Sequence, residues 1–188
     1  MRRLEPLLPA DLSEDQLALY SDITTGQRAK GPQHFALIDD DGGLAGPFNA
    51  FLLSPRLGSA LQALGAAVRY DTALSARCRE IAILVVAASW DSAFERDAHE
   101  AVGRAAGLTE AELEAIRLGK EGAFADPTET AVLELARAVS AGDLTDAEWA
   151  RFASELGRRT VFDVSTLVGY YSTLALQLRI FRVTGAKP

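Results

Sequence analysis

Hydrophobic side chains recur along the chain mostly at helical spacing, and runs that alternate strictly between apolar and polar positions are hard to find. Helix-start signals repeat as well. They are capping boxes or a serine-proline pair, and they begin at Ser13, Ser54, Thr109 and Thr145. The pattern therefore predicts an all-α fold, a multi-helical bundle.

One helix is expected to be central. It begins after Ser75, and its residues 81–88 are all apolar, so every side of it must be buried. The next helix is predicted to have Asp91 as its N-cap and to stop at Gly107, a glycine typical of a helix end. These two helices are therefore expected to form a hairpin.

A helix, then a long irregular segment, are predicted before the hairpin, and a long apolar helix is predicted after it. A first helix is predicted to run from the Ser13 cap to about Ala29, and residues 31–48 concentrate Gly, Pro and Asp, which predicts one long irregular segment. The last helix, roughly Thr160–Val183, carries a wide apolar face. We expect that face to extend into a subunit contact.

Composition and charge narrow the class of protein. The 188 residues are 48% hydrophobic, which suits one domain over 1–188, and the net charge of −7 disfavours a nucleic-acid partner. The longest apolar run has eight residues, too few to cross a membrane, and prolines interrupt the N-terminal apolar stretch that a signal peptide would need. A single cysteine, Cys78, excludes an intrachain disulfide. We expect a cytoplasmic protein.

The residues able to do chemistry gather in the second helix of the predicted hairpin. Ser92, Glu95 and His99 are offset by three and then four residues, which places them on one stripe of a helix. The stripe continues into apolar positions and is expected to face the core, whereas the opposite side, with Glu100 and Arg104, is expected to face solvent. Polar groups that point inward need partners or a purpose.

Glu80 is a second polar residue in an apolar setting, because it directly precedes the apolar run. Burial raises the pKa of a carboxylic acid, and a nearby carboxylate raises it further. Glu80, Glu95 and His99 on adjacent helices therefore predict a proton-transfer site, with Ser92 as an orienting donor.

Structural alternatives exist for each of these residues. Glu80 can pair with Arg77 or Arg79, and His99 can be a core histidine whose hydrogen bonds are satisfied within the protein. A metal site on Glu80, Glu95 and His99 is a third alternative, although no signature spacing supports it. We therefore predict that the protein uses neither a metal nor a cofactor. Cys78 is expected to pack inertly in the core.

The run from Arg77 to Leu108, RCREIAILVVAASWDSAFERDAHEAVGRAAGL, resembles the carboxymuconolactone decarboxylase and alkylhydroperoxidase-D-like family. Residues 46–55 and 168–181 are also similar to its longer single-domain members. The resemblance implies an all-α core over about 44–183, preceded by a helix and loop at 1–43. It also implies a homo-oligomer, a trimer or hexamer, with dimers also seen in the family.

The motif positions separate two branches of that family. In the peroxidase branch, the positions of Ser92 and Glu95 hold two cysteines, so the absence of both thiols removes that redox chemistry. A glutamate four residues before the histidine, here Glu95 before His99, matches the decarboxylase branch. That branch tends to have a basic residue near Ser92 and a polar one at Phe94, and here both are changed, which makes the expected pocket more apolar.

The resemblance implies a cofactor-independent enzyme that acts on a lactone or conjugated carbonyl acid, by decarboxylation or a related proton transfer. Protonated His99 would stabilise or protonate the enolate, Glu95 would orient His99, and Glu80 would relay the proton. Further residues are expected to bind the small-molecule substrate: Ser92 as an oxyanion donor, Trp90, Phe94 and Asn49 as pocket walls, and His34 as a closing residue. Two alternatives stay open, a non-catalytic oligomeric scaffold and, with less support, a thiol peroxidase.

Overall fold

The computed structural model describes residues 3–26, 29–30, 34–121 and 124–183. Within them the chain is helical, and its one pairing of extended backbone is an isolated bridge between Ile38 and Leu44. The predicted all-α, single-domain fold is confirmed. The described helices are a short 3-10 turn at Pro9–Asp11, α1 (Glu14–Thr25), α2 (Phe48–Phe51), α3 (Pro55–Tyr70), α4 (Ala76–Trp90), α5 (Ala93–Ala105), α6 (Glu110–Arg117), α7 (Pro127–Ala141), α8 (Asp146–Glu155) and α9 (Arg158–Phe181).

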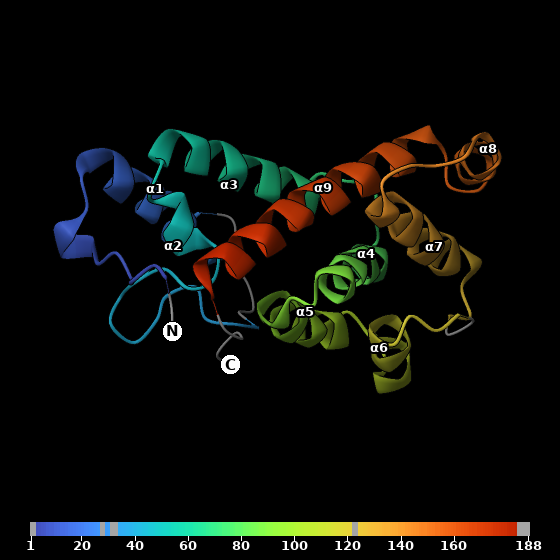
Figure 1. The fold of residues 1–188 in the computed structure, drawn as a ribbon, viewed down its shortest axis with the longest axis horizontal. Helices are drawn as coiled ribbons and strands as arrows, with labels where there is room; N and C mark the ends of the chain where they lie inside the picture. The colour runs from blue at the N-terminus through green and yellow to red at the C-terminus, as the bar shows by residue number, and fades with distance from the viewer. Residues whose placement is uncertain (1–2, 27–28, 31–33, 122–123, 184–188) are drawn as a thin grey trace.

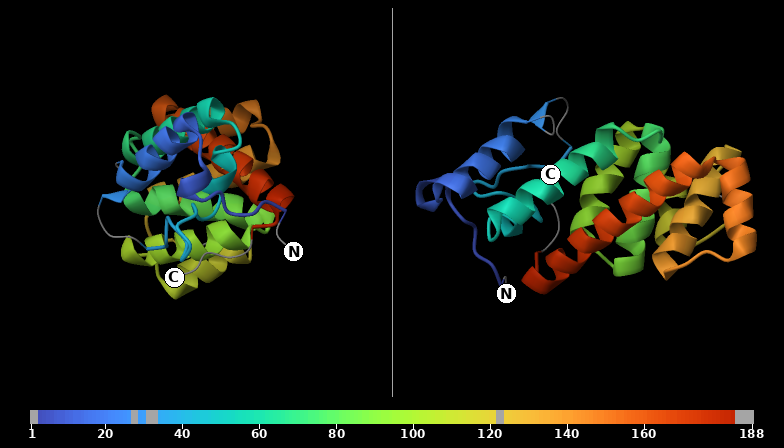
Figure 2. Two further views of the ribbon diagram at one scale, coloured as in Figure 1. Left: turned by 90° about the vertical axis from the view of Figure 1, so that its left-hand side faces the viewer. Right: turned by 90° about the horizontal axis from the view of Figure 1, so that it is seen from above.

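Helix α4 occupies the centre of the molecule, as its apolar run predicts. Residues 80–87 are all buried, and α4 packs against α5, α6, α7 and α9 (Figure 1). Helix α9 crosses α4 and also contacts α3, α7 and α8. Seen from above, α1 to α3 lie toward one end of the molecule and α7 and α8 toward the other, with α9 running between them (Figure 2).

A tight connection joins α4 to α5. Asp91 ends α4 in the left-handed conformation, with φ 47° and ψ 47°, and Ser92 then occupies the N-cap position of α5. The expectation that Asp91 caps α5 is therefore wrong by one residue. Asp is among the few residues other than glycine that adopt this conformation readily, so Asp91 serves as the turn between the helices.

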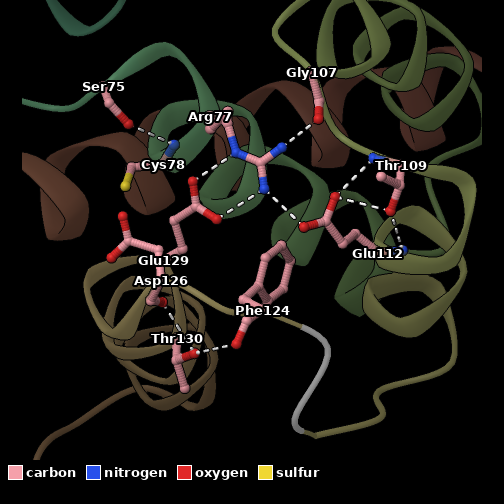
Figure 3. Close-up of polar contacts among 10 residues, drawn as sticks. All are labelled: Ser75, Arg77, Cys78, Gly107, Thr109, Glu112, Phe124, Asp126, Glu129 and Thr130. Carbon is pink, nitrogen blue, oxygen red and sulfur yellow. Dashed lines mark hydrogen bonds and ion pairs between the residues drawn. The ribbon is translucent and has the colours of Figure 1, made fainter.

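Arg77 ties the start of α4 to three neighbouring segments (Figure 3). Its guanidinium makes a two-pronged contact with Glu129 of α7, at 2.6 and 2.8 Å, and donates to Glu112 of α6 at 2.7 Å. It also donates to the carbonyl of Gly107, just after α5. Arg77 is therefore not a partner of Glu80, one of the alternatives that the sequence left open.

Two local expectations need correction. Helix α1 ends at Thr25 rather than near Ala29, because Gly26 takes an extended conformation while its N–H bonds to the Asp22 carbonyl. The irregular segment predicted at 31–48 is confirmed over its described residues 34–47, and the short helix α2 follows it. Glu100 is buried rather than exposed, because Arg117 of α6 reaches it at 2.5 Å and Arg104 at 3.2 Å. Among the described helices, none is both long and apolar enough to cross a membrane.

Candidate active site

Glu80 and His99 form a buried pair between α4 and α5. The Glu80 side chain is 0% exposed, and its Oε2 lies 2.7 Å from Nδ1 of His99. The inward stripe on α5 predicted this proximity, and Ser92, Glu95 and His99 are all buried. Helix α4 therefore supplies the carboxylate and helix α5 the imidazole, and the two groups are in direct contact.

The charges around Glu80 keep it ionised. Burial would raise the pKa of Glu80, but the charge and hydrogen bond of His99, together with the charges of Arg69 and Arg79, hold it below its usual range. An ionised carboxylate only accepts hydrogen bonds, so Nδ1 of His99 carries the proton and donates it to Glu80. Nε2 is then the ring nitrogen that can gain or lose a proton in a reaction.

Glu95 has the opposite environment. Its side chain is buried, and neither carboxyl oxygen makes a well-formed hydrogen bond to another described residue. Burial raises the pKa of Glu95 to about 8, and the hydroxyl of Ser92 offsets part of this rise. At neutral pH the group is therefore mostly a neutral carboxylic acid that can donate a proton.

Glu95 and His99 line one pocket. It lies between α5, α9 and the segment that precedes α2, and it encloses about 350 Å³ between atoms, the solvent at its mouth included. The remaining lining is apolar or aromatic: Phe35, Pro47, Phe48, Phe94, Ala98, Tyr170, Tyr171 and Leu174. Because none of the lining residues is Arg or Lys, His99 is the one lining side chain that can carry a positive charge.

Aromatic rings hold His99 and close the pocket. The Tyr171 ring meets the imidazole edge-on, with centroids 5.1 Å apart, and the Phe35 ring lies 6.4 Å from it. Phe35 also packs edge-on against Phe94 at 6.3 Å. Gly46, at φ +60°, lets the chain pass beside Phe94, because a Cβ there would lie 2.3 Å from a ring carbon.

The two glutamates hold positions different from those expected. Glu80, rather than Glu95, pairs with His99 and orients it, and Arg79 lies 3.5 Å from the other oxygen of Glu80. Glu95 instead lines the pocket in its own right. Ser92 is buried at the N-cap of α5, beside Glu95. The spacing indicated which residues converge, but not which carboxylate contacts the imidazole.

Of the expected pocket walls, only Phe94 lines the pocket. Asn49 faces the N-terminal segment, where it accepts from the backbone N–H of Leu7 at 2.9 Å and donates to the Glu5 carbonyl at 3.0 Å. The Arg179 guanidinium lies over the Trp90 ring at the end of α4. Both expectations were wrong because these side chains make other contacts.

Sequence reasoning missed the walls that come from distant segments. Tyr171 and Leu174 belong to the wide apolar face predicted for the last helix, and nothing in their spacing distinguishes a pocket wall from core packing. Phe35, next to His34 in the irregular segment, lines the pocket where His34 does not. An aromatic residue in a long loop was the available signal.

The described part of the chain contains neither a cluster of metal ligands nor a cysteine in the pocket. No group of three or more His, Cys, Asp or Glu is arranged there to hold a metal ion, and this includes Glu80, Glu95 and His99. Cys78 is buried in α4 outside the pocket lining, and burial raises the pKa of its thiol. It packs in the core, as expected.

Two solved structures share the fold of this chain. The structure matches that of the alkylhydroperoxidase AhpD core of an uncharacterized peroxidase-related protein from Ralstonia eutropha JMP134, with a TM-score of 0.74 and 14% identity over 97% of this chain and 90% of that one. It also matches the debrominase Bmp8 in complex with 2,3,4-tribromopyrrole, with a TM-score of 0.70 and 11% identity over 95% and 89% of the two chains. At these identities the two matches establish the AhpD-core fold.

A family model matches the central part of the sequence. Residues 55–138 match the model of the carboxymuconolactone decarboxylase family. No curated protein matches the chain. The resemblance to the carboxymuconolactone decarboxylase and alkylhydroperoxidase-D-like family, predicted from the motif residues, is therefore confirmed.

Proposed function

We propose that the chain is an acid–base enzyme that decarboxylates a small lactone-like or conjugated carbonyl acid, or carries out a related proton transfer on it. The observation that carries this proposal is the meeting of two different proton-handling groups in one apolar pocket. Glu95 supplies a neutral acid, and the Glu80–His99 pair supplies an oriented imidazole. Paired groups whose environments push their pKa values apart are typical of acid–base sites.

In the decarboxylation, the bond between the carboxylate carbon and the ring carbon breaks and carbon dioxide leaves. The electron pair moves into the conjugated carbonyl, which becomes an enolate. Protonated His99, whose Nδ1–H stays on Glu80, donates its Nε2–H to the enolate oxygen, and Glu95 gives its proton to the enolate carbon. Solvent then returns a proton to Glu95. The substrate's own carbonyl accepts the electrons, so this chemistry needs no cofactor.

The apolar walls support this reaction class. A substrate carboxylate in this pocket would lose most of its water and meet only one group able to carry a positive charge, His99. Such an environment destabilises the carboxylate and favours its departure as neutral carbon dioxide, while the negative charge spreads into the conjugated carbonyl. A thiol peroxidase reaction is less well supported, because the pocket lining contains no cysteine and Cys78 is buried elsewhere.

The test is a panel of lactone acids and conjugated keto acids, with carbon dioxide release measured for the wild type, Glu95→Gln and His99→Ala. We expect each substitution to lower kcat/KM by at least about 100-fold. Glu114→Gln, on the exposed face of α6, is the matched control and should retain full activity. Equal rates in the wild type and His99→Ala would overturn the role of His99. A folded wild type inactive on every acid would favour the non-catalytic scaffold.

A further inference from the structure

Aromatic rings form most of the wall of the pocket that holds Glu95 and His99. The chain contains eight phenylalanines and four tyrosines, and five of these residues line the pocket: Phe35, Phe48, Phe94, Tyr170 and Tyr171. The other lining residues are apolar: Pro47, Ala98 and Leu174. Flat, unsaturated groups pack favourably against such rings, either offset-stacked or edge-on. The wall therefore suits a ligand whose body is itself a planar ring.

Phe94 is a wall whose position is closely constrained. The Phe35 ring packs edge-on against it, with centroids 6.3 Å apart, and Ala98 and Leu178 pack beside it. The backbone of Gly46 passes so close that a Cβ there would lie 2.3 Å from a carbon of the ring. Phe94 therefore has little room to turn aside, and a ligand must fit against the ring in this position.

The charged groups of the pocket can balance one ligand carboxylate but not two. His99 is the one described lining residue that can carry a positive charge, and Nδ1 of its ring contacts Glu80 at 2.7 Å. Arg79 lies 3.5 Å from the other oxygen of Glu80, so that carboxylate does not depend on His99 alone. Glu95 adds a buried carboxyl group that makes no well-formed hydrogen bond to another described residue. A second ligand carboxylate would meet only neutral groups, the tyrosine hydroxyls among them, and burying it without a cation is costly.

We propose that the pocket selects planar, unsaturated ring acids that carry a single carboxylate, and that Phe94 is a specificity-determining residue for this choice. The Phe94 ring favours a flat body, and its apolar surface excludes a second charge from that side of the pocket. A pocket that is merely apolar would instead favour a saturated ring, which buries more apolar surface. The turnover of such acids rests on the proposed function. Their binding does not, because acids that do not react can be used to measure it.

Four carboxylates serve as non-reacting probes in isothermal titration calorimetry at neutral pH. Benzoate has a planar ring and one charge, and cyclohexanecarboxylate has a puckered ring of similar size. Terephthalate adds a second carboxylate, and the monoamide of terephthalate keeps its outline with a single charge. We expect benzoate to bind about fivefold more tightly than cyclohexanecarboxylate. We also expect the monoamide to bind at least about tenfold more tightly than terephthalate.

Substitutions of Phe94 separate the two parts of this preference. Phe94→Leu keeps the wall apolar without a ring, so the preference for benzoate over cyclohexanecarboxylate should disappear while the monoamide still binds more tightly than terephthalate. Phe94→Arg adds a cation and should bind terephthalate at least about tenfold more tightly than the wild type does. Phe162→Leu and Phe162→Arg, at an exposed position of α9, are the matched controls and should keep the wild-type preferences. Circular dichroism and thermal unfolding establish that each variant is folded.

Equal binding of terephthalate and its monoamide to the wild type would overturn the single-charge preference, and cyclohexanecarboxylate binding as tightly as benzoate would overturn the preference for a planar ring. Absence of binding by all the probes would overturn both. These wild-type measurements decide the preference even if a variant does not fold. An unchanged preference in a folded Phe94→Leu would overturn the role of Phe94. A wild type that binds the probes as expected but turns over none of the acids in the activity panel would count against the proposed reaction alone.

Discussion

Nδ1 of His99 and Oε2 of Glu80 lie 2.7 Å apart, although the two residues sit on different helices. The two-residue connection at Asp91 and Ser92 sets this distance, because it folds α5 back along α4. The imidazole is therefore oriented before any substrate arrives. Such preorganisation removes an entropic cost that a mobile base would meet during reaction.

Glu80→Gln tests the value of this pair. Because the pKa of Glu80 in the folded chain lies below its ordinary value near 4.5, the ionised pair stabilises the fold above pH 4.5. That contribution is lost as the pH falls through the folded pKa. The stability of the wild type should thus fall more steeply than that of Glu80→Gln below pH 4.5, as measured by urea unfolding from pH 3 to 7. Parallel curves would contradict the pairing.

Glu95→Gln should have the opposite signature. The pKa of Glu95 is raised from about 4.5 to about 8, so the folded state holds a proton that the unfolded state has lost. Between these pH values Glu95 therefore lowers stability as the pH rises, by up to about 1.4 kcal/mol per pH unit. Glu95→Gln should be more stable than the wild type at pH 8.

The same denaturation series needs a control carboxylate. Glu114→Gln, exposed on α6, should follow the wild-type curve throughout. If Glu95→Gln also follows the wild type between pH 5 and 8, Glu95 is ionised in the folded chain and cannot act as the neutral acid of the proposed reaction.

Gly46→Ala should disturb the pocket wall at Phe94 without changing Glu80 or His99. The added Cβ meets the Phe94 ring at 2.3 Å, and the φ of +60° costs an alanine about 1–2 kcal/mol. We expect lower stability in thermal unfolding and a weaker substrate interaction, seen as a raised KM. Phe94→Leu combined with Gly46→Ala should recover part of the stability. If the double variant loses the sum of the two single losses, Gly46 and Phe94 do not interact.

Arg77→Met should destabilise the fold without touching the site. It removes the two-pronged contact with Glu129 and the contact with Glu112, and it leaves the largely buried Glu129 without its cation. We expect a loss of about 2–3 kcal/mol in urea unfolding. Arg56→Met is the exposed control. A loss below about 0.5 kcal/mol would show that the contacts of Arg77 contribute little.

Self-association is expected through the outer face of α9. Phe162, Leu176 and Ile180 stand on that face with large exposed side chains, Phe162 at 68%. A double change of Leu176 and Ile180 to Glu should reduce the molar mass measured by light scattering after size-exclusion chromatography. Leu118→Glu, an exposed leucine after α6, is the control. An unchanged mass in the double variant would exclude this face.

The sequence was most informative where local spacing decides the outcome. Capping boxes placed the starts of α1, α6 and α8, and helical offsets predicted the burial of Ser92, Glu95 and His99. It was least informative about which of two nearby side chains makes a given contact. Whether Glu80 or Glu95 contacts His99 depends on the rotation of two helices by a fraction of a turn, and a pattern of residue types does not encode that rotation.

Partners distant in sequence were also beyond reach. Glu100 seemed exposed because its own helix offered no reason for burial, and its cover comes from Arg117 of α6. Asn49 was expected in the pocket but bonds the backbone of Glu5 and Leu7, more than forty residues earlier. Such contacts follow from how elements pack, which one sequence does not reveal.

The hairpin of α4 and α5 supplies the acid–base pair by itself, whereas most walls of the pocket come from other parts of the chain. Glu80 and His99 are nineteen residues apart and meet within one local unit, whereas the pocket walls Phe35 and Tyr171 stand at sequence positions far to either side. Loop closure makes distant contacts entropically more demanding than local ones. During folding the hairpin can therefore bring the acid–base pair together first, and the pair becomes a dry, selective site only once α9 and the segment before α2 have docked.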